Sequence, residues 1–94
     1  LEAPGSVTME FPDLAGLVAA ARARGVTTAL DNTWGAGVAL RGFEHGVDIV
    51  MQALTKYPSG GGDVLMGSVV TRDESLHRDV LLCHMRLGLG VSAN

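Results

Sequence analysis

The sequence predicts an α/β fold in which a mostly parallel sheet is flanked by helices. Three short segments, 27–33, 47–54 and 64–70, are rich in apolar and β-branched residues, and 47–54 is nearly continuous in apolar ones, as strands buried on both faces are. Helical periodicity marks the segments 12–24 and 73–87. Apolar residues make up 47% of the 94-residue chain and charged residues only 18%. This excess favours a sheet covered on both faces, partly by structure outside this segment.

Residues 1–24 predict a strand end, a loop and a helix. The stretch LEAPGSVTME, residues 1–10, is typical of a strand that runs into a Pro-Gly-Ser loop. Pro12 suits the first position of a helix, and Asp13 suits its first turn, where a carboxylate interacts favourably with exposed amides. Gly25 provides the stop. The apolar side chains in between recur at helical spacing, at Leu14, Leu17, Val18 and Ala21.

The remaining residues predict three strands and two more helices. The strand at 27–33 breaks at the pair Asp-Asn, and GAGVALRGFEHG then indicates a loop and a short helix that Gly46 closes. The strands at 47–54 and 64–70 lie on either side of the biased stretch PSGGGD. The last helix spans 73–87, with Thr71 or Asp73 available as its cap.

Charge and composition narrow the possible functions. The net charge is −3 and no basic run is present, which argues against a nucleic-acid partner. No apolar stretch approaches the roughly 18 residues of a membrane span and no signal-peptide layout appears, so no membrane partner is expected. Cys83 is the only cysteine, and we expect a buried thiol in a cytoplasmic protein.

Two further features concern metals and the extent of the chain. His77 and His84 are seven residues apart on the predicted last helix, too far for a pair of metal ligands, and no metal site is predicted. The chain has no initiator methionine, and it ends at Asn94 without a helix stop. We therefore expect an excerpt from a longer protein.

Lys56 is the only lysine, whereas the other six basic residues are arginine. It follows the apolar segment VDIVMQALT, and Asp31 follows the segment TTAL. The two residues are 25 positions apart, which fits a strand, a crossover and a second strand. Ligands of α/β folds bind at the carboxyl ends of the strands, so Lys56 and Asp31 are expected to face one crevice.

This pair of side chains suits the chemistry of pyridoxal phosphate. A lysine amine in apolar surroundings can form a Schiff base with the aldehyde of that cofactor. The cofactor ring needs a carboxylate beside its pyridine nitrogen, which Asp31 can supply, and Thr55 can offer its hydroxyl to the phosphate. Taken singly, each residue has an ordinary alternative: Lys56 as a surface or ion-paired lysine, and Asp31 as part of a turn.

Three stretches, LEAPGSVTME, ALDNTWGAGV and QALTKYPSGGGDVLMGSVV, resemble successive signatures of the Cys/Met-metabolism pyridoxal-phosphate enzymes, in the same order and spacing. The resemblance covers all 94 residues. It implies that residues 1–94 form the central part of a large cofactor-binding domain of aspartate aminotransferase fold type I. One departure is GGGD at 60–63, where relatives usually have GHSD. We expect this change to loosen the loop and to leave the cofactor site intact, because glycine is costly to order.

The resemblance also implies roles for individual residues. Lys56 matches the lysine that binds the cofactor covalently and moves the substrate Cα proton. Asp31 matches the partner of the pyridine nitrogen, and Thr55 matches a hydroxyl that contacts the phosphate. Ser6 falls where many relatives have an asparagine near the phenolic oxygen of the cofactor. Trp34 lines the same region by position, with a packed aromatic as the alternative.

The tryptophan of DNTW, with PGS and TME in the first stretch, resembles the carbon–sulfur β-lyases of this family. The resemblance implies cleavage of cystathionine, or of cysteine-like substrates, to a thiol such as homocysteine, pyruvate and ammonia. The γ-synthases, γ-lyases and sulfhydrylases share every residue named above and stay open as alternatives. Family members are usually homo-oligomers, dimers or tetramers, that take phosphate contacts from a neighbouring subunit and bind the substrate carboxylate through a C-terminal arginine. A catalytically inactive fragment is therefore expected when the 94 residues are isolated.

Overall fold

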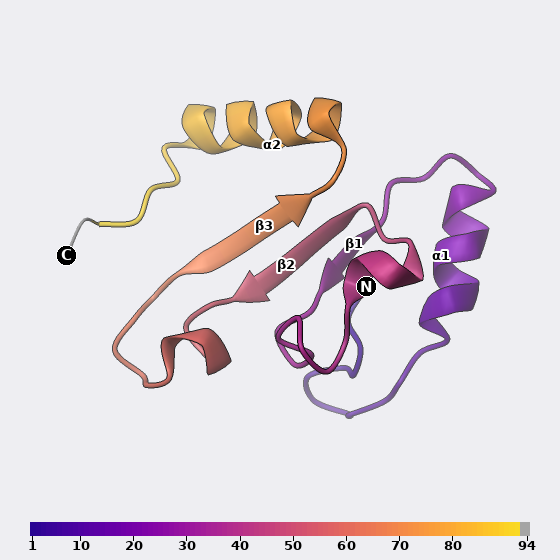
Figure 1. The fold of residues 1–94 in the computed structure, drawn as a ribbon, viewed down its shortest axis with the longest axis horizontal. Helices are drawn as coiled ribbons and strands as arrows, with labels where there is room; N and C mark the ends of the chain where they lie inside the picture. The colour runs from indigo at the N-terminus through magenta and orange to yellow at the C-terminus, as the bar shows by residue number, and fades with distance from the viewer. Residues whose placement is uncertain (93–94) are drawn as a thin grey trace.

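The computed structural model describes residues 1–92 and confirms the α/β class (Figure 1). One sheet contains three strands in the order β1 (Ala29–Asp31), β2 (Ile49–Ala53) and β3 (Gly67–Thr71). Figure 1 shows α1 (Leu14–Arg22) on the side of β1 and α2 (Glu74–Leu87) alongside β3. Two short 3-10 helices, η1 (Gly42–His45) and η2 (Tyr57–Ser59), lie in the connections on either side of β2.

The sheet is mixed because β3 runs against its neighbour. β1 and β2 are parallel, with Asp31 opposite Met51, whereas β2 and β3 are antiparallel, with Val50 opposite Val70. The connection 54–66 contains only η2 and no crossover helix. Antiparallel strands can be joined by such a short connection, but parallel strands cannot. The predicted parallel arrangement therefore holds for β1 and β2, and the direction of β3 differs from it.

The first residues extend the parallel part of the sheet. Glu2 forms a parallel bridge with Asp31, the amino group of Leu1 donates to the Ala29 carbonyl (2.7 Å), and the Asp31 N–H donates to the Leu1 carbonyl (2.9 Å). The predicted strand end is thus paired with β1, and the chain turns away after Ala3. Segment 1–3, β1 and β2 all point towards one edge of the sheet.

A small apolar core holds β1 and β2 in place. Leu30 at the centre of β1 is fully buried, and it packs with the buried side chains Leu14, Val18, Val47 and Val50. Gly42 lets η1 approach this core closely, because a Cβ atom there would lie 2.9 Å from Val50 Cγ2 and 3.0 Å from Leu30 Cδ2. Alternate residues of β1 therefore face the core, and Asp31 is left at its carboxyl end.

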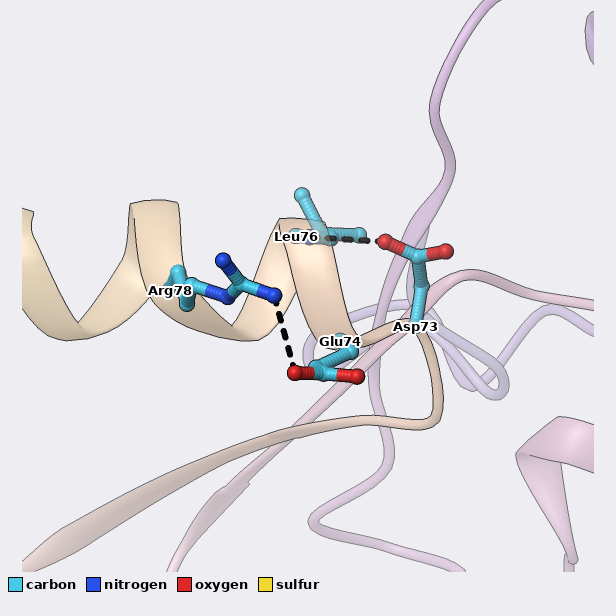
Figure 2. Close-up of polar contacts among 4 residues, drawn as sticks. All are labelled: Asp73, Glu74, Leu76 and Arg78. Atoms are coloured by element: carbon cyan, nitrogen blue, oxygen red, sulfur yellow. Dashed lines mark hydrogen bonds and ion pairs between the residues drawn. The ribbon is translucent and has the colours of Figure 1, made fainter.

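Side-chain caps define where both α-helices begin. Asp13 caps α1 by accepting from the Gly16 N–H (2.9 Å), so the helix begins at Leu14, and Pro12 lies before it rather than at its first position. A carboxylate at the cap satisfies an amide that the helix leaves unpaired, which explains the later start. For α2, Asp73 is confirmed as the cap and accepts from the Leu76 N–H (2.7 Å; Figure 2).

Two further details of the helices follow from these contacts. Figure 2 also shows the ion pair between Glu74 and Arg78 (2.8 Å), one turn apart on the exposed face of α2. Gly46 closes η1 in the left-handed conformation (φ +82°), as predicted. Within residues 1–92, no helix is long and apolar enough to cross a membrane.

Much apolar surface remains uncovered around β3 and α2. Val69 and Val70 of β3 are about half exposed, as are Leu81 and Leu82 of α2. Cys83 is exposed as well, which corrects the expectation of a buried thiol. Only Leu76 and Val80 of α2 are partly buried, and every described residue from Leu81 onward is exposed, so the part of the helix that carries Cys83 meets no covering layer among the described residues.

Thr28 and Asp48 tie β1 to β2 at their amino ends. The Thr28 N–H and hydroxyl both donate to Asp48 Oδ2 (2.7 and 2.8 Å), and the Asp48 N–H donates back to the Thr28 hydroxyl (3.1 Å). The pKa of Asp48 is lowered below its ordinary value of 3.8, chiefly by the bond from the Thr28 amide, then by the bond from its hydroxyl and by the nearby charge of Arg22. Partial desolvation opposes this shift.

This lowered pKa makes a prediction for the dependence of stability on pH. The ionised Asp48 carboxylate stabilises the folded state at pH values above 3.8, and this contribution is lost as the pH falls through the lowered pKa. We expect Asp48→Asn, which keeps an oxygen acceptor but cannot ionise, to lower the free energy of unfolding of the full-length protein at neutral pH. The difference from the wild type should vanish in acid. Chemical denaturation of both proteins across this pH range measures it, and a constant difference down to about pH 2 would contradict the assignment.

Candidate active site

The predicted site residues follow the ends of the segments that point to one edge of the sheet. Asp31 is the last residue of β1, and Thr55 and Lys56 come just after β2. Ser6 comes four residues after Glu2, the partner of Asp31 in the first segment. The pairing of Glu2, Asp31 and Met51 fixes these strand ends side by side. No hydrogen bond joins the side chains of the four predicted residues to one another within residues 1–92.

Lys56 is exposed at the start of η2, and its backbone N–H donates to the Ala53 carbonyl (3.1 Å). Its side-chain amine makes no hydrogen bond and no ion pair with any part of the described chain. Of the two ordinary alternatives, the ion-paired lysine finds no partner among residues 1–92, whereas the surface lysine agrees with the exposure of Lys56. An uncommitted amine at this edge is available to react with a carbonyl group.

Asp31 presents one engaged and one open carboxylate oxygen. Its Oδ1 accepts from the Thr33 N–H (3.0 Å) and from the Thr33 hydroxyl (2.6 Å). Its Oδ2 has no hydrogen-bond donor in the stretch that the structure describes. The aspartate forms a turn with the residue two positions later, as such residues often do. Asp31 therefore does form a turn, as in its alternative interpretation. This turn leaves Oδ2 free to accept a hydrogen bond from a ligand.

The hydroxyl groups of Thr55 and Ser6 both form hydrogen bonds within the protein. The Thr55 hydroxyl donates to the Met66 carbonyl and accepts from the Met66 N–H, both at 3.2 Å, and so ties the end of β2 to the approach to β3. Ser6 is exposed, and its hydroxyl donates to the Glu2 carboxylate. Contacts of Thr55 with phosphate and of Ser6 with the phenolic oxygen stay predictions, and each requires its hydroxyl to exchange its present partner.

Trp34 lines an apolar pocket of about 360 Å³ on another part of the surface. Phe11, Leu14 and Leu40 share this pocket, whereas neither Asp31 nor Lys56 lines it. Trp34 is itself 38% exposed, so it is not a packed aromatic among the described residues, and its place near the cofactor stays a prediction.

Ser59 holds the loop that begins at Lys56, and its residue type alone did not mark it. Its hydroxyl lies 2.8 Å from the Thr55 carbonyl oxygen, 3.0 Å from that of Lys56 and 2.9 Å from that of Gly61, and it accepts from the Gly61 N–H (3.3 Å). A single hydroxyl thus joins both ends of the turn. It supplies order to a glycine-rich loop that lacks the histidine usual in relatives.

This geometry predicts the effect of Ser59→Ala. The variant should raise the hydrogen-exchange rate of the Gly61 amide in the full-length protein by about fivefold, because a lost hydrogen bond is worth roughly 1 kcal/mol. Hydrogen exchange read by mass spectrometry measures the change. Ser75→Ala is the matched control, because Ser75 is exposed on α2 and its hydroxyl has no hydrogen bond within residues 1–92. Equal exchange in both variants would show that Ser59 does not order the loop.

The donor set at this edge fits pyridoxal phosphate. The cofactor needs an amine for its aldehyde and a carboxylate oxygen for its pyridine nitrogen. Lys56 offers the first and Asp31 Oδ2 the second, both without a competing partner among the described residues, and they follow adjacent parallel strands. No cluster of three or more metal-ligating side chains occurs in residues 1–92.

Comparisons with known proteins find relatives of similar sequence. A putative cystathionine β-lyase of Rhizobium johnstonii is 46% identical over 77 residues, which are 82% of this chain and 19% of the relative. The cystathionine β-lyase of Haemophilus influenzae is 47% identical over 72 residues, or 74% of this chain and 18% of the relative. The chain therefore spans about a fifth of the length of these relatives.

A solved structure and a family profile extend the comparison to the fold. The structure of cystathionine γ-synthase from Xanthomonas oryzae pv. oryzae in complex with cystathionine superposes with a TM-score of 0.88 at 33% identity, over 98% of this chain and 24% of that one. The profile of the family described as Cys/Met metabolism PLP-dependent enzyme matches residues 1–94. This chain belongs to the Cys/Met metabolism family of enzymes that depend on pyridoxal phosphate.

Proposed function

We propose that this chain is the central part of the cofactor-binding large domain of a longer carbon–sulfur β-lyase that cleaves cystathionine. The main support is a pair of groups that have no hydrogen-bond partner among the described residues, the Lys56 amine and Asp31 Oδ2. They lie at the carboxyl ends of the adjacent parallel strands β2 and β1. The names of two similar relatives, one a putative cystathionine β-lyase and the other a cystathionine β-lyase, support the choice of reaction. The exposed apolar surface of β3 and α2 supports the proposal that further segments of the same protein pack here.

Each predicted residue has a task in this proposal. Bound pyridoxal phosphate supplies an electron-accepting ring that stabilises negative charge at the substrate Cα. Lys56 would hold the cofactor through Nζ, and Asp31 Oδ2 would accept the N–H of the pyridine nitrogen. Thr55 would contact the phosphate after releasing Met66, and Ser6 would lie near the phenolic oxygen.

Lys56 would also move the proton on which the reaction depends. The free amine of Lys56 would accept the substrate Cα proton at Nζ, as a general base. Loss of that proton allows the thiolate on Cβ to leave. The remaining three-carbon unit hydrolyses to pyruvate and ammonia, and the thiol product from cystathionine is homocysteine.

Reactions at the γ carbon form the second candidate function. The superposition of this segment on a cystathionine γ-synthase supports this alternative. The product separates the candidates: cystathionine gives pyruvate when the bond at Cβ is cleaved and 2-oxobutyrate when the bond at Cγ is cleaved. We propose the β reaction for the full-length protein, together with a cytoplasmic homo-oligomer, a dimer or a tetramer. The isolated 94 residues are proposed to be inactive, and pyruvate release by them alone at a rate near that of a full-length relative would overturn this.

Reductive trapping tests the cofactor site directly. Pyridoxal phosphate is added to the full-length protein and to the 94-residue chain, borohydride reduces any imine, and the modified peptide is mapped by mass. We expect one adduct, on Lys56, that is absent from Lys56→Arg, because a guanidinium does not form this imine. An adduct on the full-length protein alone would mean that the pocket needs the other segments. An adduct on neither would overturn the proposed function.

A further inference from the structure

We infer that Thr33 is a positioning residue for the cofactor site. Its hydrogen bonds fix the Asp31 carboxylate relative to the end of β2, the strand that leads to Lys56. This inference rests on the proposed function, because it assigns Asp31 and Lys56 to pyridoxal phosphate. Thr33 lies two residues after β1 and is only 7% exposed. Neither its residue type nor its position in the sequence marked it as a site residue.

The Thr33 hydroxyl links the two strand ends. It donates to Asp31 Oδ1 (2.6 Å) and accepts from the N–H of Ala53 (2.9 Å), the last residue of β2. A hydroxyl has one proton, and because the Ala53 N–H already donates to it, that proton is directed to Asp31. The Ala53 carbonyl in turn accepts from the Lys56 N–H (3.1 Å). Hydrogen bonds and the backbone of Ala53 thus connect the Asp31 carboxylate to the backbone of Lys56.

The consequence of this path is geometric. Two donors from Thr33 occupy Asp31 Oδ1, so the carboxylate cannot rotate freely and Oδ2 keeps one direction. The same hydroxyl holds the end of β2, where the chain turns to place Lys56. Orientation of reacting groups to within a fraction of an ångström requires such supporting contacts. Thr33 therefore acts through Asp31 and Ala53 and not by touching substrate.

The chain provides a matched control at the opposite end of the same two strands. Thr28 is also 7% exposed, and its hydroxyl also bridges β1 and β2, from Asp48 Oδ2 (2.8 Å) to the Asp48 N–H (3.1 Å). It lies at the amino ends of the strands, away from the edge where ligands bind in α/β folds. Substitution of Thr28 therefore reproduces the loss of a buried inter-strand bridge without touching the site.

The test compares Thr33→Val, Thr33→Ser and Thr28→Val in the full-length protein. Two readouts are used: the hydrogen-exchange rates of the Ala53 and Asp48 amides, and the dissociation constant of pyridoxal phosphate from its absorbance. We expect Thr33→Val to raise the Ala53 exchange rate about fivefold and the dissociation constant about tenfold. Thr33→Ser, which keeps the hydroxyl, should stay within about twofold of the wild type in both. Thr28→Val should change only the Asp48 amide.

Each other outcome overturns the inference in a recognisable way. Unchanged cofactor affinity in Thr33→Val, with faster exchange at Ala53, would make the bridge purely structural. Equal loss of affinity in Thr33→Val and Thr28→Val would indicate general destabilisation. A loss in Thr33→Ser as large as in Thr33→Val would overturn the role of the hydroxyl, because serine keeps the hydroxyl and lacks only the methyl group. If Thr33→Val does not fold, Thr33→Ser still decides the matter, because a loss of cofactor affinity well beyond about twofold overturns the inference. Absence of a Lys56 adduct in the wild type would instead overturn the proposed function, and the inference with it.

Discussion

Replacement of Lys56 by alanine is expected to reduce turnover of the full-length protein by at least about 10³-fold, with almost no change in its stability. The two roles proposed for the amine, covalent attachment of the cofactor and transfer of the Cα proton, are both lost, and general base catalysis alone contributes roughly 10²–10⁴-fold. The fold should persist because the Lys56 side chain is exposed and makes no hydrogen bond within residues 1–92. Pyruvate release at saturating pyridoxal phosphate and thermal unfolding measure the two effects.

Two companion measurements separate the roles of Lys56. Lys56→Arg keeps the positive charge but cannot serve as a base near neutral pH, so it should be as inactive as Lys56→Ala. A small primary amine added to Lys56→Ala should restore part of the turnover, because it can take up the proton in the space left by the side chain. Activity of either variant within tenfold of the wild type, without added amine, would remove Lys56 from the proposed mechanism.

The adjacent strand ends that carry the candidate site residues could be predicted from the sequence. The lone lysine and Asp31 both follow apolar segments, and parallel strands bring their carboxyl ends to one edge whatever the details of the connections. The register of Asp31 with Met51 and the open amine of Lys56 agree with that argument. The direction of β3 was not predictable in this way, since it depends on whether residues 54–66 form a crossover helix.

The supporting contacts could not be predicted because they depend on tertiary positions. Thr33 bonds to Ala53, which is 20 residues away, and Ser59 joins backbone groups that meet only once the turn is formed. The pattern Asp-x-Thr does indicate a local turn, which is one half of the Thr33 contact. The other half, the hydrogen bond from the Ala53 N–H to the Thr33 hydroxyl, is not indicated by any residue near Thr33 in the sequence. For the same reason Thr55 and Ser6 could be selected by resemblance, but their bonds to Met66 and Glu2 could not be anticipated.

The Asp31→Asn variant is expected to bind pyridoxal phosphate about 10- to 100-fold more weakly than the wild type. A hydrogen bond to a charged group contributes roughly 1.5–3 kcal/mol, and a neutral amide cannot pair with a protonated pyridine nitrogen in the same way. Turnover should fall by at least a similar factor, because an unprotonated ring is a weaker electron acceptor. Asp31→Glu keeps the charge but displaces it by one methylene group, so an intermediate loss is expected. Asp79→Asn, which removes one charge from the exposed face of α2, is the control and should change neither quantity.

Combining this substitution with Thr33→Val tests whether the two residues act as a unit. If Thr33 serves the cofactor through the Asp31 carboxylate, then Thr33→Val should have little further effect on cofactor affinity in the Asp31→Asn background. If the two losses simply add, Thr33 contributes by another route, and the path from Asp31 through Ala53 to Lys56 is not the means by which the site is held. Exchange of the Ala53 amide should rise with Thr33→Val in both backgrounds, since that contact involves Thr33 and β2 alone. The double-mutant cycle therefore separates the part of the bridge that supports the strand from the part that directs Oδ2 towards the pyridine nitrogen.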